Sequence, residues 1–587
     1  MTPTNIAYSL TDRYLKPTGR VFLTGTQTLV KLPLMQRQMD QRDGINSAGF
    51  ISGYRGSPLG GYDQALWQAK DVLQSAQIDF QAAINEDLAA TMILGTQQVE
   101  VDDDKSVDGV FGLWYGKGPG VDRAGDAIKH GATYGSSPKG GVLVIAGDDH
   151  GCVSSSMPHQ SDVTFMAWFM PTINPATLQE YLEFGLWGIA LSRYAGVWTG
   201  FKAISETVES AASVELPELP VFNQPTDYTP PAGGLHYRWP DLPGPQLETR
   251  IEHKLAAVAA FARANPIDKR IYNLKDARFG IVTTGKAYLD LLEALRLLNI
   301  NEAKAKQLGI DIYKVGMVWP LERQGTMAFV HNKQEVLVVE EKRGIIESQI
   351  KEHMAEPDYP GRVLITGKQD ESGAPLIPYV GELTPLMLAQ FIAQRLNRLW
   401  GNSAADGLDF APLLQQLSGQ CSFAKDPGGV RRMPYFCSGC PHNSSTKVPE
   451  GSRAQAGIGC HFMASWMGRN TESLMQMGGE GVNWIAKSRY VDRAHVFQNL
   501  GEGTYFHSGS LAIRQAISAG TNITYKILYN DAVAMTGGQP VDGVISVSAI
   551  AQQMRAEGVQ RIALVTDNTD AYKDLSAFPK GISLHHR

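Results

Sequence analysis

The feature that most constrains the fold of this chain is a set of short, continuously apolar segments, each ending in small or acidic residues and followed by a helical pattern. They are residues 141–149, 279–285, 336–341, 525–531 and 561–567. Continuous apolar strands of this kind are typical of parallel sheets that are buried on both faces. The sequence therefore predicts an α/β fold of doubly wound parallel sheets.

A crossover helix is predicted after the second of these segments. Tyr288, Leu291, Leu292 and Leu295 recur at helical spacing and form one apolar stripe, which would pack back on the sheet. In open α/β sheets, ligands bind beyond the carboxyl ends of the strands. We therefore look for functional residues directly after the apolar segments.

The length of the chain predicts several domains. Its 587 residues exceed what one hydrophobic core usually supports, and its 60 glycines fit the tight turns of α/β folds. Two aperiodic stretches, 217–245 and 401–429, break the pattern. We predict three α/β domains at residues 1–228, 275–400 and 401–587, with a linker at residues 229–274.

Composition excludes several classes of protein. The net charge is −6, and no run of basic residues is longer than Arg431-Arg432, so nothing indicates a nucleic-acid partner. The chain has neither the apolar run of a signal peptide nor a segment apolar enough to span a membrane, so we expect a cytoplasmic protein without a membrane partner. Five cysteines, an odd and low number, argue against a secreted disulfide framework.

The strongest motif is Gly501-Glu502-Gly503, followed by Asn530 at the end of the next apolar segment. Glycines let the backbone approach a diphosphate, and a carboxylate and an amide oxygen at the ends of neighbouring strands can share a Mg²⁺ ion. This is the design of the thiamine-diphosphate signature, in which Asp usually stands at the position of Glu502. A glycine pair alone would indicate only a turn.

A second motif combines Cys437 and Cys440 with Cys460. Thiolates at this spacing could bind zinc together with His442 or His461, because zinc accepts mixed Cys and His ligands. They could also hold an iron–sulfur cluster. Thiamine chemistry at the neighbouring motif would need an electron acceptor, which favours the cluster.

These motifs resemble the 2-oxoacid:ferredoxin oxidoreductase family. FCSGCPH, GIGCH, MGGEG and AMTGGQP resemble its thiamine-binding half, and ISGYRGSPLGGYD, NEDLAA, WYGKGPGVDR and LVIAGDDHG resemble its pyrimidine-binding domain. The nearest resemblance is to the long single-chain indolepyruvate:ferredoxin oxidoreductases, over essentially the whole chain. It implies a pyrimidine-binding domain at residues 1–228, a transketolase C-terminal-like domain at 275–400 and a thiamine-diphosphate-binding domain at 401–587.

The resemblance also implies roles for single residues. Glu86 would contact the aminopyrimidine N1′ of thiamine diphosphate, Ser57 would lie near the thiazolium and the substrate, and His507 would be an acid, a base or a substrate contact. Without the resemblance, these residues would be a solvated helix-start glutamate, an ordinary Ser-Pro turn and a hydrogen-bonded histidine. The implied cofactor-binding residues are Gly501, Glu502, Gly503, Asn530, Gly478 and Gly479, with Glu502 and Asn530 on Mg²⁺.

For the cluster, the resemblance implies four cysteine ligands. Cys437, Cys440 and Cys460 match three of them, and neither Cys152 nor Cys421 matches the fourth position. We therefore expect the fourth ligand of the [4Fe-4S] cluster to lie outside this chain. The chain is expected to be a truncated or split form, whose last domain is cut short and whose site a downstream domain or a separate subunit completes.

The implied activity is the oxidative decarboxylation of an aryl 2-oxoacid, indolepyruvate or phenylpyruvate, to an acyl-coenzyme A. Electrons would pass through the cluster to ferredoxin. A homodimer is expected by analogy with other thiamine enzymes. Two alternatives stay open: a non-oxidative thiamine-dependent decarboxylase, which needs no cluster, and a cofactor-binding portion that is inactive without a partner.

Overall fold

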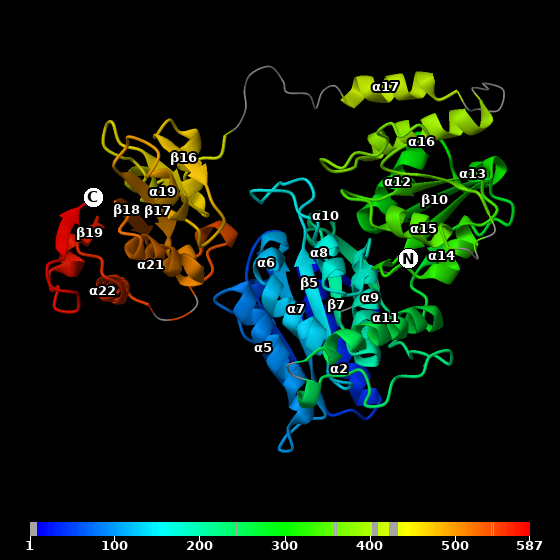
Figure 1. Ribbon diagram of the computed structural model, residues 1–587, viewed down its shortest axis with the longest axis horizontal. Helices are drawn as coiled ribbons and strands as arrows, with labels where there is room; N and C mark the ends of the chain where they lie inside the picture. The colour runs from blue at the N-terminus through cyan, green and yellow to red at the C-terminus, as the bar shows by residue number, and fades with distance from the viewer. Residues whose placement is uncertain are drawn as a thin grey trace, which may run out of the picture. The chain divides into compact units, whose positions relative to one another are not determined.

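The computed structural model describes residues 9–241, 244–356, 359, 361–401, 409–421, 433–541, 543 and 545–587. The chain divides into two compact units, Met1–Lys425 and Asp426–Arg587. Unit 1 contains two large sheets and unit 2 contains one (Figure 1). The parts of the predicted stretch 401–429 that fall on 402–408 and 422–432 lie outside the described residues, as does the side chain of Cys421.

The first large sheet of unit 1 has seven strands. Their order is β12(Met317–Trp319), β6(Thr172–Ile173), β7(Trp198–Lys202), β5(Val142–Gly147), β4(Gly109–Lys117), β2(Ser47–Gly53) and β3(Ile78–Phe80). Every neighbouring pair is parallel except β12 with β6. A separate antiparallel pair is formed by β1(Gly19–Thr24) and β8(Ala211–Leu216).

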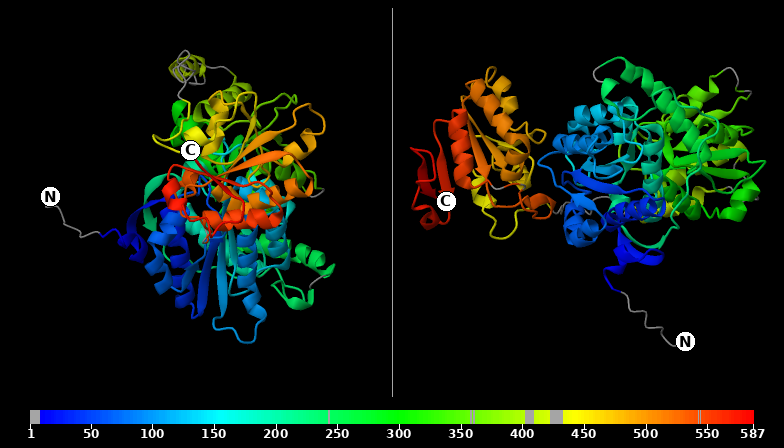
Figure 2. Two further views of the ribbon diagram at one scale, coloured as in Figure 1. Left: turned by 90° about the vertical axis from the view of Figure 1, so that its left-hand side faces the viewer. Right: turned by 90° about the horizontal axis from the view of Figure 1, so that it is seen from below.

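Helices cover both faces of this sheet (Figure 2). Alternate residues of one strand enter different cores: Leu143 and Ile145 of β5 join one cluster, and Val142 and Val144 join the other. The helices of this region are α1(Asp12–Leu15), α2(Gly25–Arg42), α3(Tyr62–Gln68), α4(Lys70–Ser75), α5(Glu86–Gln98), α6(Gly118–Arg123), α7(Gly125–Tyr134), α8(Ser161–Ala167), α9(Leu178–Ala195), α10(Ser205–Val208) and α11(Gln246–Ala264).

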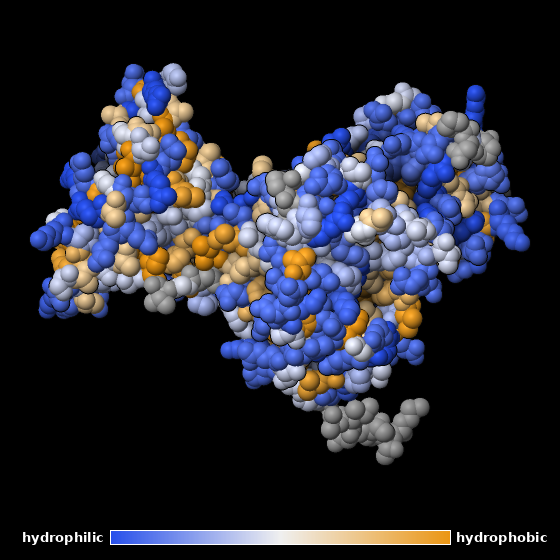
Figure 3. Space-filling view, turned by 60° about the horizontal axis from the view of Figure 1, so that its bottom comes forward, coloured by the Kyte–Doolittle hydropathy of each residue, from blue (hydrophilic) through white to orange (hydrophobic). Residues whose placement is uncertain are grey.

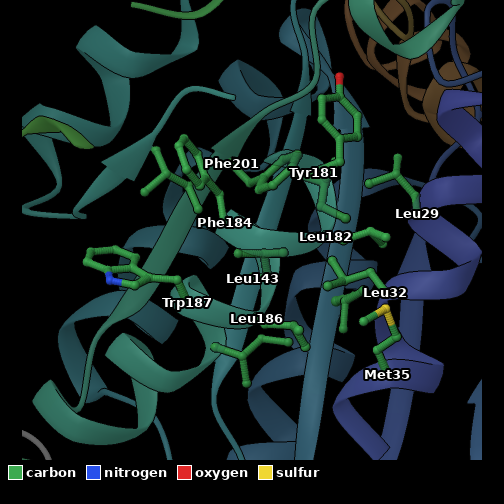
Figure 4. Packing of buried hydrophobic residues seen from close by; sticks show 14 of the residues in the cluster. Leu29, Leu32, Met35, Leu143, Tyr181, Leu182, Phe184, Leu186, Trp187 and Phe201 are labelled. Carbon is green, nitrogen blue, oxygen red and sulfur yellow. The ribbon is translucent and has the colours of Figure 1, made fainter. Parts of the chain in front are cut away.

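The largest core cluster lies between this sheet, α2 and α9. Leu182 and Leu186 of α9 lie near Leu32 and Met35 of α2, with Leu143 of β5 beside them (Figure 4). Gly185 makes this close approach feasible, because a Cβ atom there would lie 2.4 Å from Leu32 Cδ2. The predicted linker at 229–274 contains α11, whose Phe261 makes an edge-to-face contact with Trp187 of α9 and joins the same cluster.

The second large sheet of unit 1 has five strands. Their order is β14(Leu364–Thr366), β13(Glu335–Val339), β10(Phe279–Thr284), β11(Ile310–Val315) and β9(Lys269–Arg270), all parallel except β9. Its helices are α12(Gly285–Leu297), α13(Glu302–Leu308), α14(Arg323–Val330), α15(Ile346–Met354), α16(Pro385–Trp400) and α17(Ala411–Cys421). The predicted crossover helix is α12, where Leu291 and Leu295 are buried in the core.

One segment from the region of the five-stranded sheet also joins the seven-stranded sheet. After β11, residues 317–319 form β12, which pairs with β6 at the edge of the seven-stranded sheet. A buried ion pair between Lys314 and Glu180 joins the same two regions. Pairing across the two sheets explains why residues 275–400, predicted as a separate domain, cluster with the N-terminal region in one unit.

Unit 2 is built on a four-stranded parallel sheet. Its order is β16(Thr471–Leu474), β15(Ala454–Ala456), β17(Val496–Gly501) and β18(Ile523–Leu528). The larger helical elements are α19(Val482–Lys487), α21(Ser510–Ser518) and α22(Val547–Glu557), with shorter turns at α18(His442–Ser445), η4(Cys460–Trp466), α20(Glu502–Thr504) and η5(Tyr505–Gly509). Ile513, Ile550 and Met554 pack with Leu500 and Tyr505 in its core.

The structure confirms the predicted fold class of α/β with parallel sheets. Two of the five apolar segments differ from the expectation that all are buried on both faces. In β18, the edge strand that contains the start of segment 525–531, only Leu528 is buried. Residues 563–566 form β19(Ala563–Thr566), which pairs in parallel only with β20(Ser583–His586), and Val565 is 57% exposed. This pair lies outside the four-stranded sheet, so neither strand has a neighbour that would bury it.

The visible surface is mainly hydrophilic, with apolar residues in scattered groups (Figure 3). Within the described ranges, no helix is long and apolar enough to cross a membrane.

Lys254 of α11 gives a test of this packing. Its side chain is buried, and its ammonium donates to the Thr133 carbonyl oxygen at 3.1 Å. Burial, with the nearby Arg250, lowers the pKa of Lys254 to about 7 from 10.5. Between these two pH values the unfolded chain binds a proton that the folded chain does not, so the free energy of unfolding should rise with pH in this window.

We predict that Lys254→Met raises the free energy of unfolding of unit 1 at pH 7 by about 1–3 kcal/mol, because it removes a buried polar group. The gain should shrink toward pH 10. Urea unfolding at several pH values measures this, with Lys129→Met as the control because Lys129 is exposed on α7. A lower free energy of unfolding at pH 7 for Lys254→Met than for the wild type would contradict the statement that burying this ammonium destabilises the fold.

Candidate functional site

In unit 1, four motifs singled out in the sequence meet at the carboxyl ends of β2, β4 and β5. The loop after β2 carries Ser57, β4 ends at Lys117, and the loop after β5 carries Asp149, while Glu86 begins α5. A Cβ atom at Gly56 would lie 2.8 Å from Lys117 Cδ, which shows how closely the first two loops approach. Parallel pairing brings these loops to one edge of the sheet, where ligands bind in such folds.

Glu86 lies at this edge, in the first turn of α5. Asn85 caps the helix, with its side chain accepting a hydrogen bond from Leu88 N at 3.1 Å. The Glu86 carboxylate is buried, and its Oε2 lies 4.0 Å from Arg123 Nε. Gly120 leaves room for it, since a Cβ atom there would lie 2.8 Å from Glu86 Oε1. The alternative considered from the sequence, that Glu86 is a solvated glutamate at the start of a helix, is therefore wrong.

Charged side chains near Glu86 come from the end of β4, the helix after it and the loop after β5. Burial lowers the pKa of Lys117, and the carboxylates of Glu86 and Asp149 oppose this by stabilising its charged form. Glu86 thus lies in a buried setting with Lys117 and Arg123 as neighbouring cations.

Ser57 precedes Pro58 and is held by a polar network. Its hydroxyl accepts a hydrogen bond from Ser154 Oγ at 2.9 Å and donates to Glu209 Oε1 at 3.4 Å. Asp149 orders the loop that carries Ser154 by accepting from the backbone N–H of Val153 and Ser154 at 2.9 and 2.7 Å. The structure therefore joins the Ser57 loop to the loop after β5.

In unit 2, the loops after all four parallel strands lie at one edge of the sheet. Glu480, after β16, is fully buried and links two of them, because its carboxylate accepts from Ile458 N at 3.3 Å and from Gly478 N at 2.7 Å. Gly478 has a φ of +91°, and a Cβ atom there would lie 2.0 Å from Ser508 Oγ. Only glycine fits at this position.

Glu502 and Asn530 are neighbours, as the sequence motif predicts. The buried Glu502 Oε1 accepts hydrogen bonds from Asn530 N at 2.8 Å and Ala532 N at 3.0 Å. The amide nitrogen of Asn530 donates to the same oxygen at 2.8 Å and to Ala532 O at 2.9 Å. Burial raises the pKa of Glu502, and the backbone N–H groups oppose that rise. The longer Glu side chain therefore anchors the loop after β18.

This pair fits a magnesium ion. Turning the Asn530 amide by 180° would present its oxygen to Glu502 Oε1 at the same 2.8 Å separation. Two adjacent ligands of an octahedral Mg²⁺ ion, each at 2.0–2.1 Å, are about 2.9 Å apart. A cation could thus replace the amide hydrogens without moving either side chain far.

The other predicted residues of unit 2 lie near this edge. Gly501 ends β17, and neither Gly501 nor Gly503 has a positive φ, so neither position requires glycine for its backbone conformation. Gly479 follows Gly478 in the loop after β16. His507 is buried in η5, with its Nδ1 2.7 Å from Ser508 Oγ.

Cys437, Cys440 and Cys460 lie in the same unit. Cys440 N donates to Cys437 O at 3.0 Å, which closes the turn between them. Burial, and then the charges of Cys440 and Cys437, raise the pKa of Cys460. All three are free thiols, and among the described residues no three or more His, Cys, Asp or Glu side chains form a ready metal-binding group.

Sequence reasoning missed two polar residues at this edge. His461 is buried, and neither of its ring nitrogens has a hydrogen-bond partner; both amide atoms of the buried Asn499 also lack one. Burial and the nearby His442 lower the pKa of His461 to about 3, so the ring is neutral. The motif GIGCH held the signal for His461, which was considered only as a zinc ligand, whereas Asn499 gave no sequence signal.

A buried charged cavity in unit 1 was also not predicted. It lies between the two sheets and is lined by Lys202, Lys286, His150, Glu340 and Glu341 among others. Lys286 is paired with Asp290 and Glu382, each at 2.7 Å, and Lys202 with Asp162 at 2.7 Å. These charges pair with one another, which is how buried ions are usually tolerated.

Comparisons with known proteins agree with the motifs. Residues 269–409 match the family model described as the indolepyruvate oxidoreductase domain. The chain is 24% identical over 447 residues to the indolepyruvate oxidoreductase subunit IorA of Thermococcus kodakarensis, covering 70% of this chain and 63% of the relative. It is 23% identical over 607 residues to the IorA subunit of Pyrococcus abyssi, covering 97% and 84%.

Two solved structures are similar to a lesser degree. One is a 2-oxoglutarate:ferredoxin oxidoreductase from Magnetococcus marinus, with a TM-score of 0.45, 14% identity, and 65% of this chain and 66% of that chain covered. The other is a split-gene transketolase, with a TM-score of 0.36, 14% identity, and 66% and 97% covered.

The chain is thus a relative of the indolepyruvate oxidoreductases, and the resemblance inferred from its motifs is confirmed. Its match spans less than two thirds of the length of the Thermococcus subunit.

Proposed function

We propose that this chain is the thiamine-diphosphate-binding component of an oxidoreductase that decarboxylates an aryl 2-oxoacid, with coenzyme A accepting the acyl group. The observation that carries the proposal is the edge of the unit 2 sheet, where Glu502 and Asn530 adjoin glycine loops and two buried polar side chains without partners. The names of the relatives, indolepyruvate oxidoreductase subunits, support an aryl substrate.

The residues present fit the cofactor. Glu502 and Asn530 would hold Mg²⁺, and the backbone at Gly501, Gly503, Gly478 and Gly479 would approach the diphosphate. Bound thiamine diphosphate supplies a nucleophilic carbon and an electron sink for decarboxylation. Glu86, in its buried setting with Lys117 and Arg123, would share a proton with the aminopyrimidine N1′. Ser57 and His507 would contact the substrate or the reacting end of the cofactor.

The three cysteines distinguish this function from a non-oxidative thiamine enzyme, which needs no electron acceptor. Cys437, Cys440 and Cys460 would provide three ligands of a [4Fe-4S] cluster that passes electrons to ferredoxin. We propose that a further domain or a partner subunit provides the fourth ligand and that the assembly is a cytoplasmic homodimer. The inactive cofactor-binding portion remains the second candidate, since the described residues contain no ready metal-binding group.

The first prediction from the proposed function concerns the magnesium pair. Glu502→Ala should abolish binding of thiamine diphosphate with Mg²⁺, because it removes an anionic ligand of the cation and the anchor of the loop after β18. Calorimetry measures the affinity, and circular dichroism checks that the fold is intact. Glu557→Ala, at the end of α22 in the same unit, serves as the control, because Glu557 pairs with Arg514 on the surface away from the glycine motif. Unchanged affinity in Glu502→Ala would refute the cation site.

The second prediction concerns Glu86. Glu86→Gln should keep the cofactor bound but slow hydrogen–deuterium exchange at its C2 carbon by about a hundredfold or more, because an amide cannot share a proton with N1′. Exchange followed by nuclear magnetic resonance measures this. Glu209→Gln is the matched control. It makes the same chemical change at a glutamate of the Ser57 network, which is not proposed to share a proton with N1′. Wild-type exchange in Glu86→Gln would rule out the proposed proton transfer.

The third prediction concerns the cluster. The chain by itself should hold iron poorly, because a stable four-iron cluster needs four ligands and three matching cysteines are present. Adding the partner that carries the fourth cysteine should restore the cluster and viologen reduction by an aryl 2-oxoacid and coenzyme A. Iron and acid-labile sulfide are measured in both samples. Full occupancy in the chain alone would contradict the need for an outside ligand.

A further inference from the structure

His461 is the buried polar side chain whose chemistry the fold leaves unexplained. It is 2% exposed, and neither Nδ1 nor Nε2 has a hydrogen-bond partner. Buried polar groups in folded proteins are nearly always hydrogen-bonded, and one without a partner costs stability. A phenylalanine would fill the same space without that cost. Packing alone therefore does not explain why a polar ring occupies this position.

The position of the ring shows what it faces. His461 is the second residue of η4, which follows the glycine loop after β15, and three glycines surround the imidazole. Cβ atoms at Gly457, Gly459 and Gly501 would lie 2.9, 3.0 and 3.3 Å from its nearest ring atom. Gly457 and Gly459 follow β15, and Gly501 ends β17, so the ring lies between the loops of two adjacent parallel strands.

Asn499 adds a second polar side chain to the same place. It is fully buried in β17, two residues before Gly501, and both atoms of its amide lack partners. Its backbone oxygen would lie 2.5 Å from a Cβ atom at Gly457, the glycine that also contacts the His461 ring. Asn499 and Gly501 lie on the same face of β17, because they are two residues apart, and Gly501 faces the His461 ring. Two side chains without partners on one face at one sheet edge point to one ligand that satisfies both.

We propose that His461, assisted by Asn499, donates a hydrogen bond to the diphosphate of the cofactor. This inference rests on the proposed function and assigns that function a binding residue outside the glycine motif. An imidazole carries at least one N–H and an amide two, so both side chains provide donors for an anionic oxygen. The glycine loops on either side let a phosphate group come close to these donors.

The test compares variants that keep volume and remove polarity. His461→Phe should lower the affinity for thiamine diphosphate with Mg²⁺ by about tenfold to a hundredfold, because a hydrogen bond to a charged group is lost. The affinity for thiamine, which has no phosphate, should stay the same. Asn499→Leu should act in the same direction. Calorimetry is done on metal-free protein resupplied with Mg²⁺, so that zinc on the cysteines does not interfere.

Stability provides a second readout. Without ligand, His461→Phe should raise the melting temperature of the transition that the cofactor stabilises in the wild type, because a buried polar group without a partner is removed. His495→Phe is the matched control: His495 lies just before β17, at the opposite end of the strand, and its Nε2 is 2.8 Å from Thr524 Oγ1. That variant should not change the affinity for the cofactor.

The outcomes separate the inference from the function on which it rests. If the wild type does not bind thiamine diphosphate, both fail. If Glu502→Ala abolishes binding but His461→Phe binds like the wild type, the inference alone is overturned. Loss of zinc binding with unchanged cofactor affinity in His461→Phe would assign the ring to the cysteines and also overturn it. A lower melting temperature with unchanged affinity would mean a structural role, and would do the same.

Discussion

The parallel pairing of β17 with β15 on one side and β18 on the other is the constraint on which the candidate site of unit 2 depends. Parallel strands direct their carboxyl ends to one edge, so the loops that carry His461, Glu502 and Asn530 lie together although they are far apart in the sequence. Glu480 and Glu502 fix these loops through backbone N–H groups. Carboxylates that organise loops in this way create a rigid setting before any ligand binds.

The same constraint acts in the seven-stranded sheet of unit 1. At its edge, charged side chains are buried as ion pairs. The pairs are Lys202 with Asp162 and Arg55 with Asp63, and both pairs are almost fully inaccessible to solvent. Buried pairs of this kind add little net stability, because desolvation offsets their attraction. They do fix the geometry of the loops after β2, β5 and β7. Polar groups kept at such a cost are expected where a chain binds or transforms a ligand.

Much of the fold could be predicted from the sequence, because strand burial and helix amphipathicity are local patterns. Residues 279–285 and the stripe on α12 are examples. That Glu502 and Asn530 lie close together could also be predicted, because the two residues follow adjacent parallel strands. The pairing of β12 with β6, the exposure of β19 and the isolation of His461 and Asn499 could not be predicted. Each depends on which distant segment packs beside the residue, and no local pattern encodes that.

The most direct test of the account is a crystal structure of the chain with thiamine diphosphate, with Mn²⁺ in place of Mg²⁺ so that anomalous scattering marks the cation. The account predicts one manganese peak coordinated by Glu502 and the turned amide oxygen of Asn530, with phosphate oxygens within hydrogen-bond distance of His461. A cofactor bound at another place, or manganese absent from Glu502 while its carboxylate keeps the backbone hydrogen bonds of Asn530 and Ala532, would contradict it.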